Sequence, residues 1–231
     1  MKSIAIIPAR GGSKRIPHKN IVDFFGKPLI AYTIEAALLS NLFDRVIVST
    51  DSEEIAKVSQ SLGAEVPFLR VENADDFTPV SEATLSALLQ AESYYNIKFD
   101  TVVQLMANCP IRDADLLVLQ YEYFIKNRLN FLISCFEYGW TNPWWAATLD
   151  ETNTPTALFE NKNIRSQDLP KLVCPSGSMW IANSHSLQEE KTFYGADHKF
   201  FEIPWENAVD IDSYEDLKFA KCIYNFKHQT W

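Results

Sequence analysis

Short apolar runs alternate with longer segments of helical periodicity over the first half of the chain. The apolar runs have the length of buried strands and lie at 3–8, 45–50, 64–69 and 101–106. Helices are expected at 30–39, 52–62 and 81–95, the second opened by a cap at Asp51 or Ser52 and ended by Gly63. This alternation predicts an α/β fold with a mostly parallel sheet and helices on both faces.

Functional side chains are expected along one edge of that sheet. Active sites of open α/β sheets lie beyond the carboxyl ends of the strands. The loops after Pro8, Thr50, Leu69 and Met106 are therefore the places to look for chemistry.

The pattern changes after about residue 130. Strands are expected at 131–136, 178–182 and around 200–204, and a final helix at 213–226. Between them, 137–170 contains an aromatic stretch and then a polar stretch without helical periodicity; its tryptophans are Trp140, Trp144 and Trp145. So much tryptophan needs a surface to cover it. We interpret 137–170 as an insertion within a single domain of 1–231, as an arm or subunit contact, or else as a local aromatic cluster of that domain.

Composition narrows the range of partners. The 231 residues include 21 basic and 30 acidic side chains, and the net charge of −9 argues against nucleic acid or an anionic membrane as the main partner. No apolar stretch approaches the roughly 18 residues of a membrane span, and the first residues lack the apolar core of a signal peptide. The four cysteines are widely spaced and read as reduced thiols. We expect a cytoplasmic protein in which a local basic cluster could still bind a small anion.

Such a cluster follows the first strand. Four cations lie within ten residues, together with two glycines and a serine: Arg10, Gly11, Gly12, Ser13, Lys14, Arg15 and Lys19. A triphosphate needs converging cations and a close backbone approach, which glycine allows. The loop therefore predicts a triphosphate site; the alternative is a solvated basic turn. Its spacing matches neither a P-loop nor a dinucleotide fingerprint.

Two further positions carry candidate chemistry. Arg70 ends the expected strand 64–69 at the active edge, where a guanidinium can offer several donors to a ligand. The alternative for Arg70 is a surface ion pair with Glu72, Asp75 or Asp76. Asp210 and Asp212 are two residues apart, so that in an extended segment both carboxylates point to one face and can share Mg²⁺. In the alternative, Asp212 caps the final helix, with Glu215 three residues on.

The motifs at 6–20, 25–28 and 46–51, followed by those at 165–170 and 209–212, resemble the acylneuraminate cytidylyltransferases. These enzymes transfer CMP from CTP to nine-carbon sugar acids. The resemblance implies a Rossmann-like fold of the nucleotide-diphospho-sugar transferase type and a homodimer whose arm, at 137–170, reaches the partner's pocket. It also implies roles for individual residues: Arg10, Ser13, Lys14 and Lys19 on the phosphates, Asn20 on the nucleoside, Arg70 near cytosine or ribose, Asp210 and Asp212 on Mg²⁺, and Arg165, with Gln167 beside it, on the sugar-acid carboxylate.

Two departures from the family pattern concern the acceptor sugar. In the segment 106–112, which includes Asn108, Met106 replaces a glutamine that touches the sugar in sialate-activating members. At 175–178, Ser176 stands where members tend to have asparagine. Both changes point away from N-acetylneuraminate. The motifs at 12–17 and 165–169 look closer to the pseudaminic-acid branch.

These observations predict a direct displacement. The anomeric hydroxyl of the sugar acid attacks the α-phosphorus of CTP and pyrophosphate leaves, while Arg10, Lys14, Lys19, Asp210 and Asp212 with Mg²⁺ balance the developing charge. One alternative is a sugar-1-phosphate nucleotidyltransferase. The other is a non-catalytic nucleotide-binding module.

Overall fold

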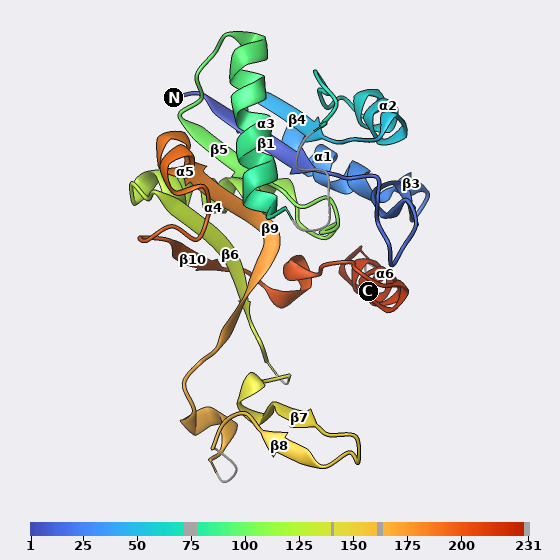
Figure 1. Cartoon of the computed structure of the whole chain (residues 1–231), viewed down its shortest axis with the longest axis vertical. Coiled ribbons are helices and arrows are strands. Elements are labelled where there is room, and N and C mark those ends of the chain that lie inside the picture. The colour runs from blue at the N-terminus through green and yellow to red at the C-terminus, as the bar shows by residue number, and fades with distance from the viewer. Residues whose placement is uncertain (72–77, 140, 161–163, 229–231) are drawn as a thin grey trace.

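The computed structural model describes residues 1–71, 78–139, 141–160 and 164–228. Over these residues the body of the protein is built on a sheet with the strand order β10-β6-β9-β5-β1-β4 (Figure 1). The strands are β1 (Ser3–Pro8), β4 (Arg45–Ser49), β5 (Thr101–Gln104), β6 (Phe131–Glu137), β9 (Val173–Asn183) and β10 (Lys199–Glu202).

Most strand pairs are parallel, as predicted. β1 pairs in parallel with β4 and β5, and β6 with β10. β9 is the exception, because it runs antiparallel between β5 and β6. The chain leaves the sheet along β6 and returns beside it along β9, so this pair has opposite directions.

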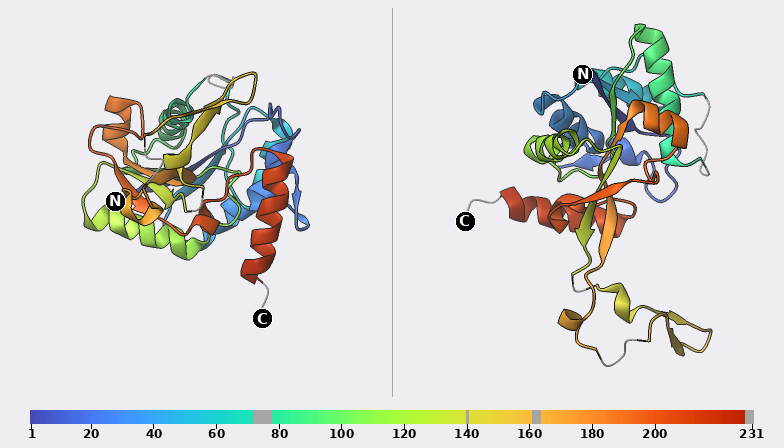
Figure 2. Two further views of the ribbon diagram at one scale, coloured as in Figure 1. Left: turned by 90° about the horizontal axis from the view of Figure 1, so that it is seen from below. Right: turned by 90° about the vertical axis from the view of Figure 1, so that its left-hand side faces the viewer.

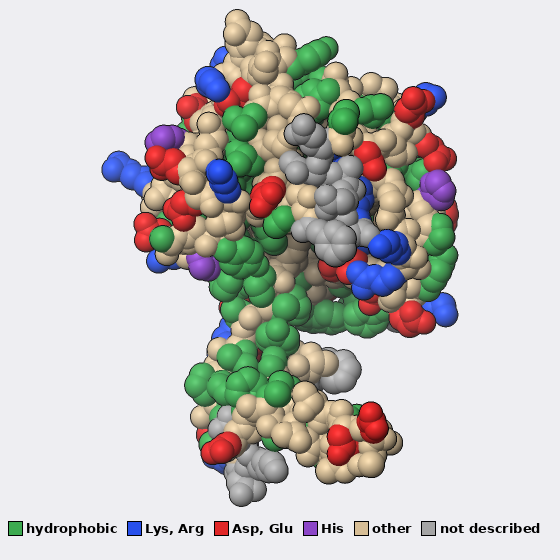
Figure 3. Space-filling view, in the orientation of Figure 1, with side chains coloured by type: hydrophobic (Ala, Val, Ile, Leu, Met, Phe, Trp, Pro, Cys, Tyr) green, Lys and Arg blue, Asp and Glu red, His purple; other side chains and the backbone are tan. Residues whose placement is uncertain are grey.

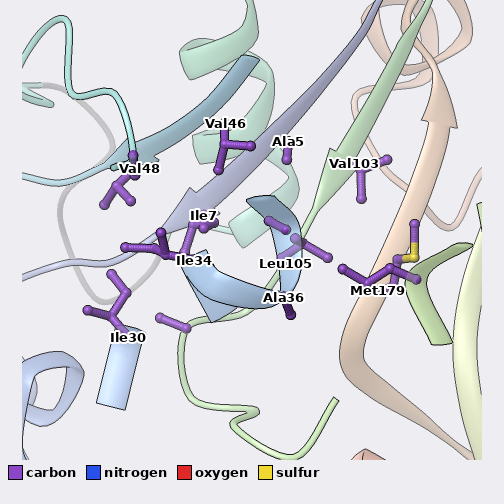
Figure 4. Packing of buried hydrophobic residues seen from close by; sticks show 14 of the residues in the cluster. Ala5, Ile7, Ile30, Ile34, Ala36, Val46, Val48, Val103, Leu105 and Met179 are labelled. Carbon is purple, nitrogen blue, oxygen red and sulfur yellow. The ribbon is translucent and has the colours of Figure 1, made fainter. Parts of the chain in front are cut away.

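Helices cover both faces of the sheet (Figure 2). One face carries α1 (Leu29–Leu39), α2 (Glu53–Ser61) and α4 (Ala114–Lys126), and the other carries α3 (Val80–Tyr95) and α5 (Ser184–Glu190). Each face has a hydrophobic core between the helices and the sheet. In the core on the first face, Ile30 and Ile34 of α1 pack with Ile7 and Val48 (Figure 4). A third core joins α6 (Tyr214–His228) to the hairpin of β2 (Asp23–Phe24) and β3 (Lys27–Pro28).

The expected strand at 64–69 is wrong. The segment makes a single parallel bridge to the sheet, in which the Glu65 amide donates to the Val46 carbonyl and the Glu65 carbonyl accepts from the Val48 amide, both at 2.9 Å. Pro67 has no N–H to donate, so the ladder stops there. Two helices, α4 and α5, were not expected. Each begins at a polar cap, with Asp113 accepting from the Leu116 amide at 2.9 Å and Asn183 from the His185 amide at 3.0 Å.

The segment between β6 and β9 projects from the body as an arm (Figure 1). It contains a small hairpin, β7 (Ala147–Leu149) with β8 (Pro155–Ala157), and two short 3₁₀ helices, η2 (Pro143–Trp145) and η3 (Ser166–Asp168). Trp144 packs within the arm, with its ring 5.0 Å from that of Phe159 and its indole N–H 2.9 Å from the Pro170 carbonyl. Every residue of the hairpin strands is exposed. Two more 3₁₀ helices, η1 (Lys19–Ile21) and η4 (Trp205–Ala208), belong to the body.

Candidate active site

A cavity of about 590 Å³ opens at the carboxyl ends of β1 and β5. Its lining includes most of the residues that the sequence nominated: Arg10, Ser13, Lys14, Lys19, Asn20, Arg70, Met106, Asn108, Asp210 and Asp212. Seven further residues line the cavity: Arg15, which belongs to the same basic cluster, and Pro8, Ile16, Thr78, Val80, Ala83 and Ala107, to which the sequence assigned no role. The basic loop, the start of α3, the loop after β5 and the segment before α6 thus meet at one place.

The basic loop is anchored to its neighbours by the backbone. The Asn20 amide group donates to the Arg10 carbonyl at 2.9 Å, and the Gly11 amide donates to Asp51 Oδ1 at 2.7 Å. A Cβ on Gly11 would lie 3.0 Å from that of Ser52, whereas one on Gly12 would meet nothing within 4 Å. Neither glycine lines the cavity. Gly11 therefore serves the close packing of the loop on the start of α2, which differs from the phosphate contact that we expected.

Asp212 is held by two cations of that loop. Its Oδ1 lies 2.7 Å from Lys19 Nζ, and its Oδ2 lies 2.6 Å from Arg15 Nη2. The side-chain amide of Asn108 lies 3.4 Å from the same Oδ1. The site thus joins the basic loop directly to the carboxylate pair. The sequence places Arg15 among the four cations of the loop but assigns it no separate role, and the structure shows that it pairs with Asp212.

The alternative that Asp212 caps the final helix is wrong. Ser213 and Asp216 cap α6 instead. The Ser213 amide donates to Asp216 Oδ2 at 2.7 Å, and the Asp216 amide donates to Ser213 Oγ at 3.2 Å, which is the reciprocal pattern of a capping box. The Asp212 carboxylate is left to face the cavity.

The two carboxyl groups differ in their titration. Burial raises the pKa of Asp210 to about 6, and the nearby charge of Asp212 adds to this effect. Asp210 is open to the cavity on one side, so the shift comes from the protein that surrounds it elsewhere. Burial also acts to raise the pKa of Asp212, but Lys19 and Arg15 outweigh it and hold that pKa below its ordinary value.

Asp210 and Asp212 are of the ligand type that Mg²⁺ uses. In the described ranges, no group of three or more His, Cys, Asp and Glu side chains is arranged to hold a metal ion. Mg²⁺ does not require such a cage, because it keeps waters and uses one or two carboxylates together with phosphate oxygens. Asp210 and Asp212 line the cavity beside the basic loop, which is where phosphates would meet them.

Arg70 also lines the cavity. Its amide donates to the Thr50 carbonyl at 2.7 Å, and the residue is only 7% exposed. Burial lowers the pKa of its guanidinium, and the charge of Asp51 opposes that shift. The alternative of an ion pair with Glu72, Asp75 or Asp76 lies outside the described residues.

The residues nominated for the sugar acid are scattered. Met106 and Asn108 line the cavity. Ser176 is buried outside the lining, and its hydroxyl lies 3.3 Å from the Ala208 carbonyl and 3.1 Å from the Ser178 amide that donates to it. Its expected contact with sugar is not supported, because backbone groups occupy the hydroxyl. Arg165 and Gln167 are exposed on the arm and do not line the cavity of the same chain; Arg165 pairs with Asp168 at 2.8 Å.

Comparisons with known proteins point to one enzyme family. A family model described as cytidylyltransferase matches residues 4–165. The pseudaminic acid cytidylyltransferase of Campylobacter jejuni subsp. jejuni serotype O:2 is 39% identical over 100% of this chain and 99% of its own length. The CMP-N,N'-diacetyllegionaminic acid synthase of Legionella pneumophila subsp. pneumophila is 34% identical over 100% of this chain and 99% of its own length.

A solved structure shares the fold. The structure of a CMP:2-keto-3-deoxy-manno-octonic acid synthetase complexed with CTP has a TM-score of 0.72 to this chain and covers 98% of it and 100% of its own chain. Its sequence identity of 16% limits the comparison to the fold. Separately, none of the helices in the described ranges combines the length and apolar character that crossing a membrane requires.

Proposed function

The chain belongs to the cytidylyltransferase family, and from this we propose that it transfers CMP from CTP to the anomeric hydroxyl of a nonulosonic acid of the pseudaminic type. Relatives named for pseudaminic and diacetyllegionaminic acids support this acceptor class. One structural observation carries the proposal: cations of the basic loop and the carboxylate pair line a single cavity, with Lys19 Nζ 2.7 Å from Asp212. A basic loop alone would explain only the binding of a triphosphate. The two carboxylates beside it are what suggest that the bound triphosphate also reacts.

The chain's own residues bind and orient CTP in this proposal. Arg10, Lys14 and Lys19 converge on the triphosphate and neutralise the charge that moves toward the leaving pyrophosphate. We assign the nucleoside to Arg70 and Asn20, which line the same cavity. Mg²⁺ held by Asp210 and Asp212 would supply further charge neutralisation at phosphate oxygens.

The displacement forms one bond and breaks one. The anomeric oxygen of the acid bonds to the α-phosphorus, and the bond from that phosphorus to the bridging oxygen breaks. Pyrophosphate leaves with the bridging oxygen and its electron pair, and the hydroxyl proton passes to solvent. Holding the acid and CTP in line in one cavity supplies much of the acceleration.

We further propose a homodimer in which the arm of one chain completes the pocket of the other. The arm projects from the body and carries exposed apolar side chains, with Trp145 49%, Leu149 65% and Leu158 59% exposed (Figure 3). Exposed apolar surface of this kind favours a protein partner. Arg165 and Gln167 could then reach the acid of the second chain, where a guanidinium can form a bidentate pair with the carboxylate.

Release of pyrophosphate tests the function. The purified protein with CTP and Mg²⁺ is expected to release it with a pseudaminic-type acid, and more slowly or not at all with N-acetylneuraminate. Sugar 1-phosphates in the same assay test the first rival, which would give pyrophosphate with them and none with the acids. The second rival, a non-catalytic module, would bind CTP without turnover. No release with any nonulosonic acid would reject the proposal.

A further inference from the structure

Arg112 is a buried cation that the proposed chemistry does not use. It lies between the loop after β5 and α4 and is only 3% exposed. Its Nη2 donates to the Thr33 hydroxyl at 2.5 Å and to the carbonyl of Met106, and its Nη1 donates to the carbonyls of Gly177 and Ser178. Burial lowers the pKa of Arg112 to about 10, so it stays charged at neutral pH. The groups that accept its hydrogen bonds are all neutral, and the nearby charge of Asp210 only partly offsets the effect of burial. A buried charge with neutral hydrogen-bond partners is unfavourable, so its presence calls for a reason.

These hydrogen bonds tie three elements together. Thr33 lies on α1, Met106 lies in the loop after β5, and the other two carbonyls belong to β9. The planar guanidinium reaches all three at once, which a single ammonium cannot do. The Met106 amide donates in turn to the Gly177 carbonyl at 3.2 Å. Arg112 thereby fixes the position of Met106 relative to the sheet.

The loop that Arg112 fixes holds the carboxylate segment. The Ile211 amide donates to the Asn108 carbonyl at 3.0 Å, and the Asn108 side-chain amide donates to the Ile211 carbonyl at 3.2 Å. Next in the loop, Cys109 Sγ lies 3.8 Å from Asp210 Oδ1. Asp210 and Asp212 flank Ile211, so their place in the cavity depends on the loop 106–109.

The same loop also packs closely against Gly177 of β9. A Cβ at this position would lie 2.7 Å from Met106 Cγ, 3.0 Å from Met106 Cβ and 3.3 Å from Cys109 Sγ. A glycine is therefore required there, and alanine would push the loop away from β9. This provides a second way to displace the loop while the Arg112 side chain is left intact.

We propose that Arg112 is a positioning residue for the transfer reaction, which acts through the loop 106–109 to set Asp210 and Asp212 against the triphosphate. The inference rests on the proposed function. It differs from a merely structural role because the basic loop, besides its ion pairs with Asp212, has an anchor of its own at Asp51. Displacement of the loop 106–109 should thus impair turnover and metal binding more than CTP binding.

Two variants test it against one control. Arg112→Lys and Gly177→Ala should each lower kcat about 100-fold, the order of loss that a misplacement of about 1 Å produces, and change KM for CTP by less than about threefold. Binding of Mn²⁺ in the presence of CTP, followed by electron paramagnetic resonance, should weaken in both. Glu92→Ala removes a buried carboxylate that accepts from the Phe99 amide at 3.2 Å near the far end of α3. It should lower the melting temperature without changing kcat or Mn²⁺ binding.

The results separate the possibilities. If kcat and Mn²⁺ binding are kept in both variants, or if the losses match those of Glu92→Ala at equal folded fraction, the positioning role is overturned. If Arg112→Lys does not fold, Gly177→Ala decides by the same criteria. A wild-type protein inactive with every acid would reject the proposed function, whereas an active one with unaffected variants would reject this inference alone.

Discussion

Asp210 and Asp212 have their carboxyl groups in the same cavity, but their surroundings give them different properties. Asp212 is balanced by Lys19 and Arg15, and its pKa is held down. Asp210 faces the cavity with a raised pKa of about 6. The two carboxyl groups are therefore expected to respond differently to pH and to substitution.

A catalytic role of Asp212 can be distinguished from a role in the stability of α6. Asp212→Ala should reduce turnover by at least about 100-fold, because it removes charge balance at the reacting phosphates, and should leave α6 folded. Ser213→Ala is the matched control: it removes the cap and should cost about 1 kcal/mol of the free energy of unfolding with turnover kept. Steady-state kinetics and urea unfolding of both variants check this. Turnover that survives in Asp212→Ala would contradict the role of this carboxylate.

Asp210 gives a prediction about pH. Its folded pKa of about 6 lies above the ordinary 3.8, so its stabilising contribution is complete below about pH 4 and is lost as the pH rises through about 6. Asp210→Asn should therefore be more stable than wild type at pH 8, with a difference that shrinks on acidification. The gain should be less than the roughly 3 kcal/mol that the shift alone would give, because the carboxylate is open to solvent. Urea unfolding at pH 4.5 and pH 8 in a chelator measures it, and an equal difference at both values would contradict the burial effect.

Arg15 gives a prediction about CTP. Arg15 lines the cavity beside Lys19, where its guanidinium can contact the phosphates of CTP. Arg15→Gln should therefore raise KM for CTP about tenfold, which corresponds to the loss of one charge-assisted hydrogen bond. Lys27→Gln is a control of the same chemistry, since Lys27 pairs with Glu35 at 2.7 Å outside the cavity lining. Titration of CTP binding by calorimetry distinguishes them. Equal effects of the two changes would show that only overall charge matters.

Among the helices and strands, the sequence pattern located those whose position is set by nearby residues. β1, α1, α2, α3 and α6 have clear periodicity or caps and were found with only small shifts in their ends. The segment 64–69 was misjudged because apolar content alone does not show that Pro67 interrupts a ladder. Ser176 was misassigned because its partner, the Ala208 carbonyl, is 32 residues away. Long-range contacts of this kind leave no periodic signal in the chain.

The exposed apolar side chains of the arm are expected to hold the proposed dimer together. Leu149→Glu together with Leu158→Glu places charges on exposed apolar positions and should shift the protein from dimer to monomer at micromolar concentration. Because Arg165 would no longer reach a second pocket, KM for the acid should rise and CTP binding should persist. Thr148→Glu with Thr156→Glu adds the same charge to polar positions of the same hairpin as a control. Sedimentation analysis with kinetics checks both, and a double leucine variant that is still dimeric, or a wild-type monomer that is fully active, would contradict the proposed dimer.

The whole molecule has a net charge of −9, whereas cations are concentrated in the lining of the cavity. The acidic surface disfavours polyanions as partners, while converging cations in the cavity attract a small one. Loops from both ends of the chain build the site: the basic loop follows β1, and the carboxylates precede α6. Sequence motifs could nominate these residues, but only the fold shows that Lys19 and Asp212 lie 2.7 Å apart.

Transfer of CMP from CTP to the acid can be followed directly in a ³¹P nuclear magnetic resonance time course of CTP, Mg²⁺ and a pseudaminic-type acid with the protein. The triphosphate signals are expected to fall while a phosphodiester of CMP and pyrophosphate rise in equal amounts, and Asp212→Ala is expected to show neither. Unchanged CTP with every nonulosonic acid, under conditions in which calorimetry shows CTP bound, would contradict the proposed transfer.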